Sequence, residues 1–147
     1  MICPGMYPES VAYQLKRAQH ALRLALDAEL EKVGLSLAQY AALAALKEQP
    51  NASNAGLARL CFVTPQTMNA LLAGLVDERL VQRRPHPGHG RIITLRLTDR
   101  GARVFAEADR LAAEVEGRMV AGTSPQERKR LVALLRTFTD SLAAGTA

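Results

Sequence analysis

The amino-acid sequence predicts a mainly α-helical protein, in which six helices accompany one two-stranded β-hairpin. Apolar residues make up 48% of the 147 residues, yet the aromatic ones are only three Phe and three Tyr, so alanine and leucine, which favour helices, dominate. Apolar side chains recur at steps of three and four through most of the chain, as on one face of a helix. The exception is residues 92–97, where apolar and polar side chains alternate as in a half-buried strand.

Two helices are expected in the N-terminal third. The first covers about residues 8–32, carries an apolar face and ends at Gly34. Ser36 and Gln39 have the spacing of a capping box, in which each side chain bonds the other residue's backbone N–H. The second helix is therefore expected to begin there and to run to about Glu48, just before a proline.

A pair of shorter helices follows. One is expected from Ser53 to about Leu60, and Thr64 and Pro65 open another that runs to about Glu78. A hydroxyl at the N-cap and a proline at the first helical position are both typical of a helix start. Because only about three residues separate the two helices, they are expected to form a helix-turn-helix.

A β-hairpin is expected directly after this pair. Residues 80–84 and 92–97 are expected to form its strands, and Ile93 and the alternate positions after it to face the core. Residues 85–90 contain two prolines and two glycines, which favour an exposed turning loop. A hairpin in this place makes a winged helix-turn-helix, and it is called the wing below.

Two further helices complete the chain. Thr98 and Asp99 can cap a long helix that ends near Gly122. Ser124 and Glu127 have capping-box spacing, and a proline lies at the first helical position between them, so a sixth helix begins there.

The first, fifth and sixth helices have apolar faces that one copy of the chain covers poorly. Burying such faces stabilises by about 25 cal/mol per Å², and a second copy is the natural cover. The sequence therefore predicts a homodimer, with a dimerisation region at residues 1–34 and 98–147. Residues 35–97 are then the winged helix-turn-helix domain.

The net charge of +5 lies in the middle of the chain. Residues 1–50 carry five basic and five acidic side chains, and residues 104–147 carry six of each. Residues 51–103 carry eight arginines against three acidic residues, so they hold the whole excess. A basic centre between neutral arms indicates a module that binds a polyanion such as DNA.

Short motifs follow one another in this basic centre. They read LARL at 57–60, VTPQTM at 63–68, LVQRR at 80–84 and LRLTDRG at 95–101, with Gly90-Arg91 before the last. In this order and spacing they resemble the MarR family of winged helix-turn-helix transcriptional regulators, and the last motif resembles that family's Leu-Thr-x-x-Gly signature. The resemblance implies a ligand-responsive repressor that acts as a homodimer on palindromic double-stranded DNA. It also implies small phenolic or lipophilic effectors, whose binding residues no motif identifies.

The second helix of the helix-turn-helix is expected to read bases in the major groove. The DNA-binding residues expected on this motif are Ser53, Thr64, Pro65, Gln66, Thr67 and Asn69. Gln66 and Asn69 can each pair with adenine N6 and N7, and the Thr67 methyl can touch a thymine methyl. Ser53 and Thr64 lie at helix starts, where free backbone N–H groups favour a phosphate. The alternatives are plain capping for these two hydroxyls and a solvated helix face for Gln66 and Asn69.

The wing is expected to add cations. Arg91 resembles the family's wing arginine, which enters the minor groove, and Arg84 lies on the facing strand. The family commonly places an acidic residue before that arginine, whereas this chain has His86 and His89 there. An imidazole cannot clamp a guanidinium as a carboxylate does, so two alternatives follow: the wing is looser, or His89 itself contacts a phosphate. Arg79 is a second departure, since the family usually has a glycine there that often takes φ > 0, so the local geometry is expected to differ.

Other site chemistries find less support. A structural zinc site needs four ligands, and the histidines and cysteines do not supply a set, so neither a metal nor a cofactor is expected. Cys61 lies between apolar residues and is expected to be a small buried hydrophobe. Redox sensing through Cys3 stays an alternative, as does a protein-interaction adaptor with a diverted winged module. No catalytic motif is found, so an enzyme is not expected.

The sequence predicts a cytoplasmic location. Its longest apolar runs are far shorter than the ~18–20 residues that cross a bilayer, and its first residues do not resemble a signal peptide. No membrane partner is therefore expected.

Overall fold

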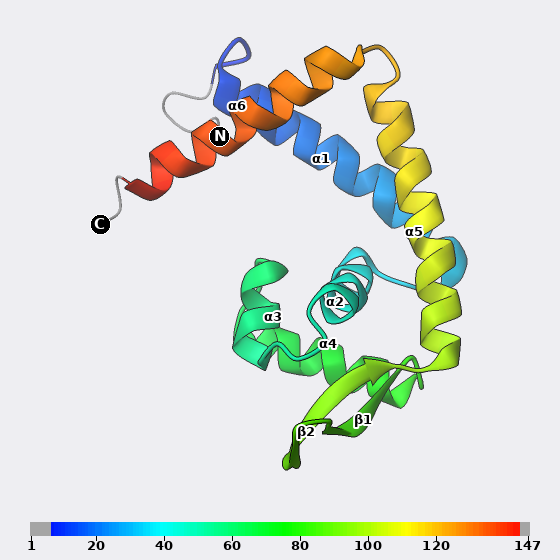
Figure 1. Cartoon of the computed structure of the whole chain (residues 1–147). Coiled ribbons are helices and arrows are strands. Elements are labelled where there is room, and N and C mark those ends of the chain that lie inside the picture. Colours follow the sequence, from blue (N-terminus) through cyan, green and yellow to red (C-terminus); the bar gives the residue numbers. More distant parts are fainter. Residues whose placement is uncertain (1–6, 145–147) are drawn as a thin grey trace. The chain divides into compact units, whose positions relative to one another are not determined.

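The computed structural model describes residues 7–144, which form six α-helices, one short 3-10 helix and one antiparallel hairpin (Figure 1). The predicted fold class is confirmed. The elements are α1 (Val11–Leu30), η1 (Glu31–Val33), α2 (Leu37–Glu48), α3 (Asn54–Leu60), α4 (Pro65–Asp77), β1 (Val81–His86), β2 (His89–Leu97), α5 (Asp99–Val120) and α6 (Pro125–Ala144). The chain divides into two compact units, one that extends to Val115 and one that begins at Glu116.

Helix starts follow the predicted caps. The Ser36–Gln39 capping box is formed in both directions, and Ser53 and Thr64 each accept a backbone hydrogen bond at the start of α3 and α4. The backbone N–H of Ser124 donates to the Glu127 carboxylate at 2.7 Å. Hydrogen bonds from the backbone and the hydroxyl of Ser124 lower the pKa of this carboxyl.

The core of the first unit joins α1, α2, α4 and β1. The largest fully buried side chains are Leu30, Leu43, Met68, Leu75 and Val81. Helix α2 contacts α1, α3, α4 and β2, so it is the central element of this unit. No helix among residues 7–144 is both long and apolar enough to span a membrane.

The first half of α5 is fixed to α2 by an aromatic contact. The Phe105 ring stacks on Tyr40 with centroids 5.7 Å apart, and Lys47 Nζ lies 4.9 Å from the Phe105 centroid. The Tyr40 hydroxyl donates to Asp109 at 3.0 Å. Helix α5 therefore continues from the wing into a fixed position on the core.

The Leu-Thr-x-x-Gly motif forms the junction between the wing and α5. The Thr98 backbone N–H donates to the Leu80 carbonyl at 3.0 Å, and the Thr98 hydroxyl accepts from the Gly101 N–H at 2.9 Å. The same hydroxyl donates to the Arg79 carbonyl at 2.7 Å. A Cβ on residue 101 would lie 1.9 Å from the Leu80 carbonyl oxygen, so only glycine fits.

Among residues 7–144, two that are not glycine have positive φ. Arg79 has φ 60°, the left-handed conformation that the resemblance associates with a glycine, so the expected difference in local geometry is not found there. Phe62 has φ 55° in the turn between α3 and α4. The Phe62 side chain is 96% exposed, so its packing within the chain does not offset this strain. The left-handed conformation costs an ordinary residue roughly 1–2 kcal/mol.

We expect Phe62→Gly to stabilise the fold. The change relieves the left-handed conformation and removes a side chain that packs on almost nothing, and glycine's flexibility in the unfolded chain offsets part of the gain. The free energy of unfolding should rise by about 0.5 kcal/mol, measured by urea denaturation. Gly34→Ala is the matched control and should lower the free energy of unfolding, because Gly34 has φ 73° and open space around it. A loss of stability on Phe62→Gly would contradict the strain.

The strands of the wing are longer than predicted. The ladder continues through Pro85, which pairs with Ile93, and a register shift follows before His86 pairs with His89. The expected loop at 85–90 is therefore wrong, and only the residues between His86 and His89 form the turn. A two-stranded sheet has only edge strands, on which a proline without an N–H is tolerated.

The second strand agrees with the prediction at its base, where Leu95 and Leu97 pack against the core, but differs toward its tip. Thr94 is 9% exposed, whereas Ile93 is 57% exposed and the neighbouring Ile92 is exposed too. The Thr94 hydroxyl donates to the Arg84 carbonyl at 3.3 Å, which satisfies it within the ladder. The hairpin extends beyond the core, so the alternation that predicts burial at Ile93 does not apply near the tip.

Candidate nucleic-acid interface

Helix α4 separates a buried apolar face from an exposed polar one. Its buried side chains are Met68, Leu72 and Leu75, which pack in the core. Gln66, Thr67 and Asn69 are exposed, as reading a base edge requires.

The start of α4 fixes the direction of these side chains. Thr64 is the N-cap and Pro65 the first helical residue. The Thr64 hydroxyl accepts from the Thr67 backbone N–H at 3.1 Å and donates to the Thr67 hydroxyl at 2.9 Å. Because this bond holds the Thr67 hydroxyl, its methyl is the group left for a base. Both Thr64 and Ser53 act as caps, and a cap can contact phosphate in addition.

Asn54 is a residue that the sequence reasoning missed. Its side-chain amide donates to the Pro65 carbonyl at 3.0 Å and so joins the first turn of α3 to that of α4. Its other side-chain atom, Oδ1, is buried and has no hydrogen-bond partner among the described residues. The only sequence signal is an asparagine next to the Ser53 cap, which says nothing of a partner in another helix.

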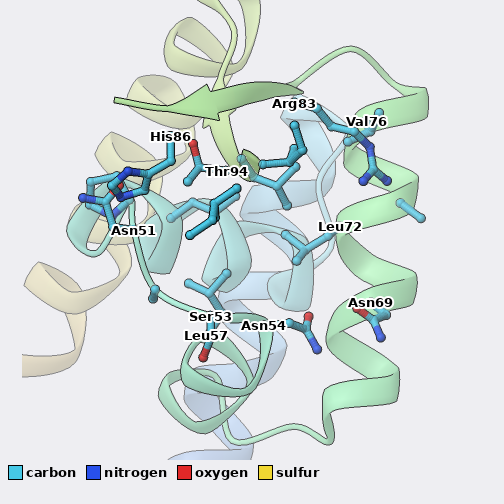
Figure 2. Close-up of a pocket in the computed structure, with 17 residues that line it drawn as sticks. Asn51, Ser53, Asn54, Leu57, Asn69, Leu72, Val76, Arg83, His86 and Thr94 are labelled. Atoms are coloured by element: carbon cyan, nitrogen blue, oxygen red, sulfur yellow. The ribbon is translucent and has the colours of Figure 1, made fainter. Parts of the chain in front are cut away.

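A groove of about 450 Å³ separates α3 and α4 from the wing (Figure 2). Asn54 and Asn69 line it on the two helices. Arg83, His86 and Thr94 line it at the wing. The groove therefore joins α4 to the wing in one concave surface, whose lining is largely apolar and carries polar side chains and one arginine, Arg83.

The wing presents cations to solvent. Arg84, His89 and Arg91 are all exposed, and so is Arg83, which was not among the predicted site residues. The segment 80–98 contains no acidic residue. Among the ion pairs of the described residues, none involves these arginines. Their charge therefore stays available to an anionic partner.

Two other arginines of the basic centre are used within the chain. Arg96 donates to the Pro50 carbonyl and, at 2.9 Å, to the Asn51 side chain, which ties the wing to the loop before α3. Arg100 donates to the Glu78 carbonyl at 3.1 Å. The net charge of the segment thus overstates the number of free cations.

The cysteine and metal hypotheses have different outcomes. Cys61 is partly buried against the core, and burial raises the pKa of its thiol, which opposes reactivity. Cys3 lies outside the described residues. Within residues 7–144 no three side chains of metal-ligating type gather into a site.

Comparisons with known proteins identify the fold and its class. Residues 33–92 match the family model described as MarR family. The HTH-type transcriptional repressor Rv2887 of Mycobacterium tuberculosis (strain ATCC 25618 / H37Rv) is 35% identical over 120 residues, covering 81% of this chain and 86% of the relative. This chain belongs to the MarR family. It is therefore a winged helix-turn-helix transcriptional regulator and not an enzyme, as the sequence predicts.

Solved MarR family structures share the fold. A complex of Mycobacterium tuberculosis Rv2887 with salicylic acid has a TM-score of 0.72 at 30% identity, and covers 88% of this chain and 96% of that one. The transcriptional repressor CouR bound to a 23-mer DNA duplex has a TM-score of 0.79 at 28% identity, and covers 92% and 96%.

Proposed function

We propose that this MarR family protein is a homodimeric repressor that occupies a palindromic operator and is released by a small aromatic acid. The observation that carries the proposal is the exposed polar face of α4 beside an exposed, unpaired set of wing cations. The CouR complex, a repressor of the same fold on duplex DNA, supports it.

The reading residues are proposed on α4. Gln66 and Asn69 take adenine edges in the major groove and the Thr67 methyl contacts thymine. Pro65 starts the helix, while the caps Ser53 and Thr64 take phosphates through free backbone N–H groups.

The wing supplies the second contact with the duplex. Arg91 enters the minor groove, where negative potential favours a guanidinium, and Arg84 and His89 contact the backbone. Side chains of α4 and of the wing, on either side of the protein groove, thereby contact the sugar-phosphate backbone between the major and minor grooves of the DNA.

A second copy is proposed to cover apolar surface on α1 and α6. Val11, Leu15 and Leu24 are exposed on α1, and α6 has no buried residue. Leu131 and Leu134 are exposed on the same turn of α6. Residues 1–34 and 98–147 therefore form the dimerisation region in this proposal, and residues 35–97 bind DNA. A dimer presents two reading helices about 34–36 Å apart, one turn of duplex.

The effector is proposed to bind a cavity of about 270 Å³ between α2, β2 and α5. Leu97 and Phe105 give it apolar walls, and Lys47 and Arg96 supply cations at its edge. A flat acid with one carboxylate matches this chemistry. The salicylic acid complex of Rv2887 shows that a relative binds such a molecule.

One binding assay tests the three parts of this proposal. Fluorescence anisotropy with a labelled duplex from the DNA upstream of the gene should give tight binding that weakens steeply with salt. Light scattering on the same samples should give two chains per duplex. Salicylate should lower the affinity for the duplex.

The outcomes that contradict the proposal are distinct. Equal affinity for a scrambled duplex would remove the operator, and one chain per duplex would remove the dimer. An adaptor with a diverted module would bind neither duplex and would elute early from heparin. No response to salicylate or to related benzoates would remove the proposed effector class.

A further inference from the structure

We propose that docking of the wing on DNA is coupled to uptake of one proton by His89, and that His86 is the positioning residue that holds the turn around it. This inference rests on the proposed function. It concerns how the wing binds, and it assigns different protonation states to two neighbouring histidines.

The two histidines close the hairpin. His86 and His89 are the last pair of the ladder, and their ring centroids lie 5.6 Å apart at an interplanar angle of 37°. The Gly88 backbone N–H donates to His86 Nδ1 at 3.0 Å. This bond spans the turn, so His86 sets the conformation of the residues that lead into His89.

The bond fixes the protonation state of His86. A nitrogen that accepts a hydrogen bond carries no proton, so the His86 ring is neutral and has its hydrogen on Nε2. A proton on Nδ1 would remove the acceptor from the Gly88 N–H. It would also place a cation beside any cation on His89. His86 therefore stays neutral while the turn is intact.

His89 has no such bond. Its side chain is exposed, and within residues 7–144 its one ring contact is with His86. It is therefore free to change its protonation state without breaking the turn.

The charges around His89 are all of one sign. On the wing strands they are Arg83 and Arg84 of β1 and Arg91 and Arg96 of β2. The residues that line the groove from the loop before α3, from α3 and from α4 carry no charge. Within residues 80–98 no acidic side chain is therefore available to pair with His89.

Duplex DNA supplies the anion that the wing lacks. Phosphates placed against the wing favour the imidazolium, because it gains a charge-assisted hydrogen bond to an oxyanion. The complex then binds more protons than the free protein. By linkage, the affinity for DNA rises as the pH falls, by at most about tenfold per pH unit for one proton.

The experiment measures the dissociation constant for the operator duplex by anisotropy between pH 6 and 8 at constant ionic strength. Affinity of the unmodified protein should rise about fivefold or more from pH 8 to pH 6, within the one-proton limit. His89→Gln should abolish this slope, so that the variant binds equally well at pH 6 and pH 8. His20→Gln is the matched control, since His20 is an exposed histidine on α1, and it should keep the full slope.

The positioning role of His86 has its own test. An asparagine side chain accepts a hydrogen bond from the N–H two residues on, as His86 does, but has no proton to exchange. His86→Asn should therefore keep both the affinity and the slope. His86→Ala should weaken binding several-fold at pH 8 and flatten the slope. A slope that His86→Ala leaves unchanged would remove the positioning role.

Calorimetry in two buffers of different ionisation enthalpy counts the protons directly. Uptake near pH 7 should be detected for the unmodified protein and lost in His89→Gln. Operator binding without pH dependence, or a slope that survives His89→Gln, would overturn the inference and leave the proposed function intact. Failure to bind the operator at every pH would overturn both.

Discussion

Gly101→Ala is expected to cost about 3 kcal/mol of the free energy of unfolding, the upper range for inserting a methyl group into a packed site. The added Cβ would lie 1.9 Å from the Leu80 carbonyl oxygen and 2.8 Å from its carbon. These are backbone atoms, so relief requires movement of β1 or α5. That movement would also break the hydrogen bonds of Thr98 that join the two elements. Urea denaturation followed by circular dichroism measures the loss.

A second glycine of the same helix provides the control. Gly117 lies inside α5, and a Cβ added there would have nothing within 4 Å. Gly117→Ala should therefore stabilise the helix by up to about 1 kcal/mol, because alanine is the better helix former. Equal effects of the two substitutions would show that the contact at Gly101 is not tight.

The substitutions Gln66→Ala and Arg91→Ala are expected to have the largest effects on DNA binding. Loss of a bidentate adenine contact costs about 1–3 kcal/mol, or roughly 5- to 150-fold in affinity, and only at the base that is read. Arg91→Ala should weaken binding to operator and scrambled duplexes alike and make the salt dependence less steep. Competition anisotropy at several salt concentrations separates the two behaviours.

Exposed residues of the same types serve as controls. Gln19 lies on α1 and Arg130 on α6, outside the proposed reading surface, and both are exposed. Gln19→Ala and Arg130→Ala should leave the specificity and the salt dependence unchanged. If Gln66→Ala weakened all duplexes equally, the proposed base contact would be wrong.

The sequence predicts local structure well where one short pattern determines it. Hydroxyl caps place the starts of α2, α3 and α4, since a cap and its partner lie three residues apart. The left-handed conformation of Arg79 has no such local signal, and only the glycine that the family usually has there points to it. The ends of the wing strands are predicted less well, because the prolines that favour a loop are also tolerated on an edge strand.

Contacts between distant segments could not be predicted in this way. The bond from Asn54 to Pro65 and the bonds of Arg96 to the loop before α3 depend on how elements pack, not on a local pattern. The exposure of Gln66 and Asn69 follows from helical periodicity. The bases proposed to contact them, and the effector proposed to bind beside Arg96, are molecules that the sequence does not encode.

The hydrogen bonds from Arg96 to Pro50 and Asn51 affect the entropic cost of the proposed binding of DNA. A hairpin held only by its own strand pairing would move relative to the helix-turn-helix. Binding a duplex would then restrict that motion at an entropic cost. Here a guanidinium already restrains the base of the hairpin against the loop that leads into α3. The wing is therefore already oriented relative to the helix-turn-helix, and less conformational entropy is lost in the proposed complex with the duplex.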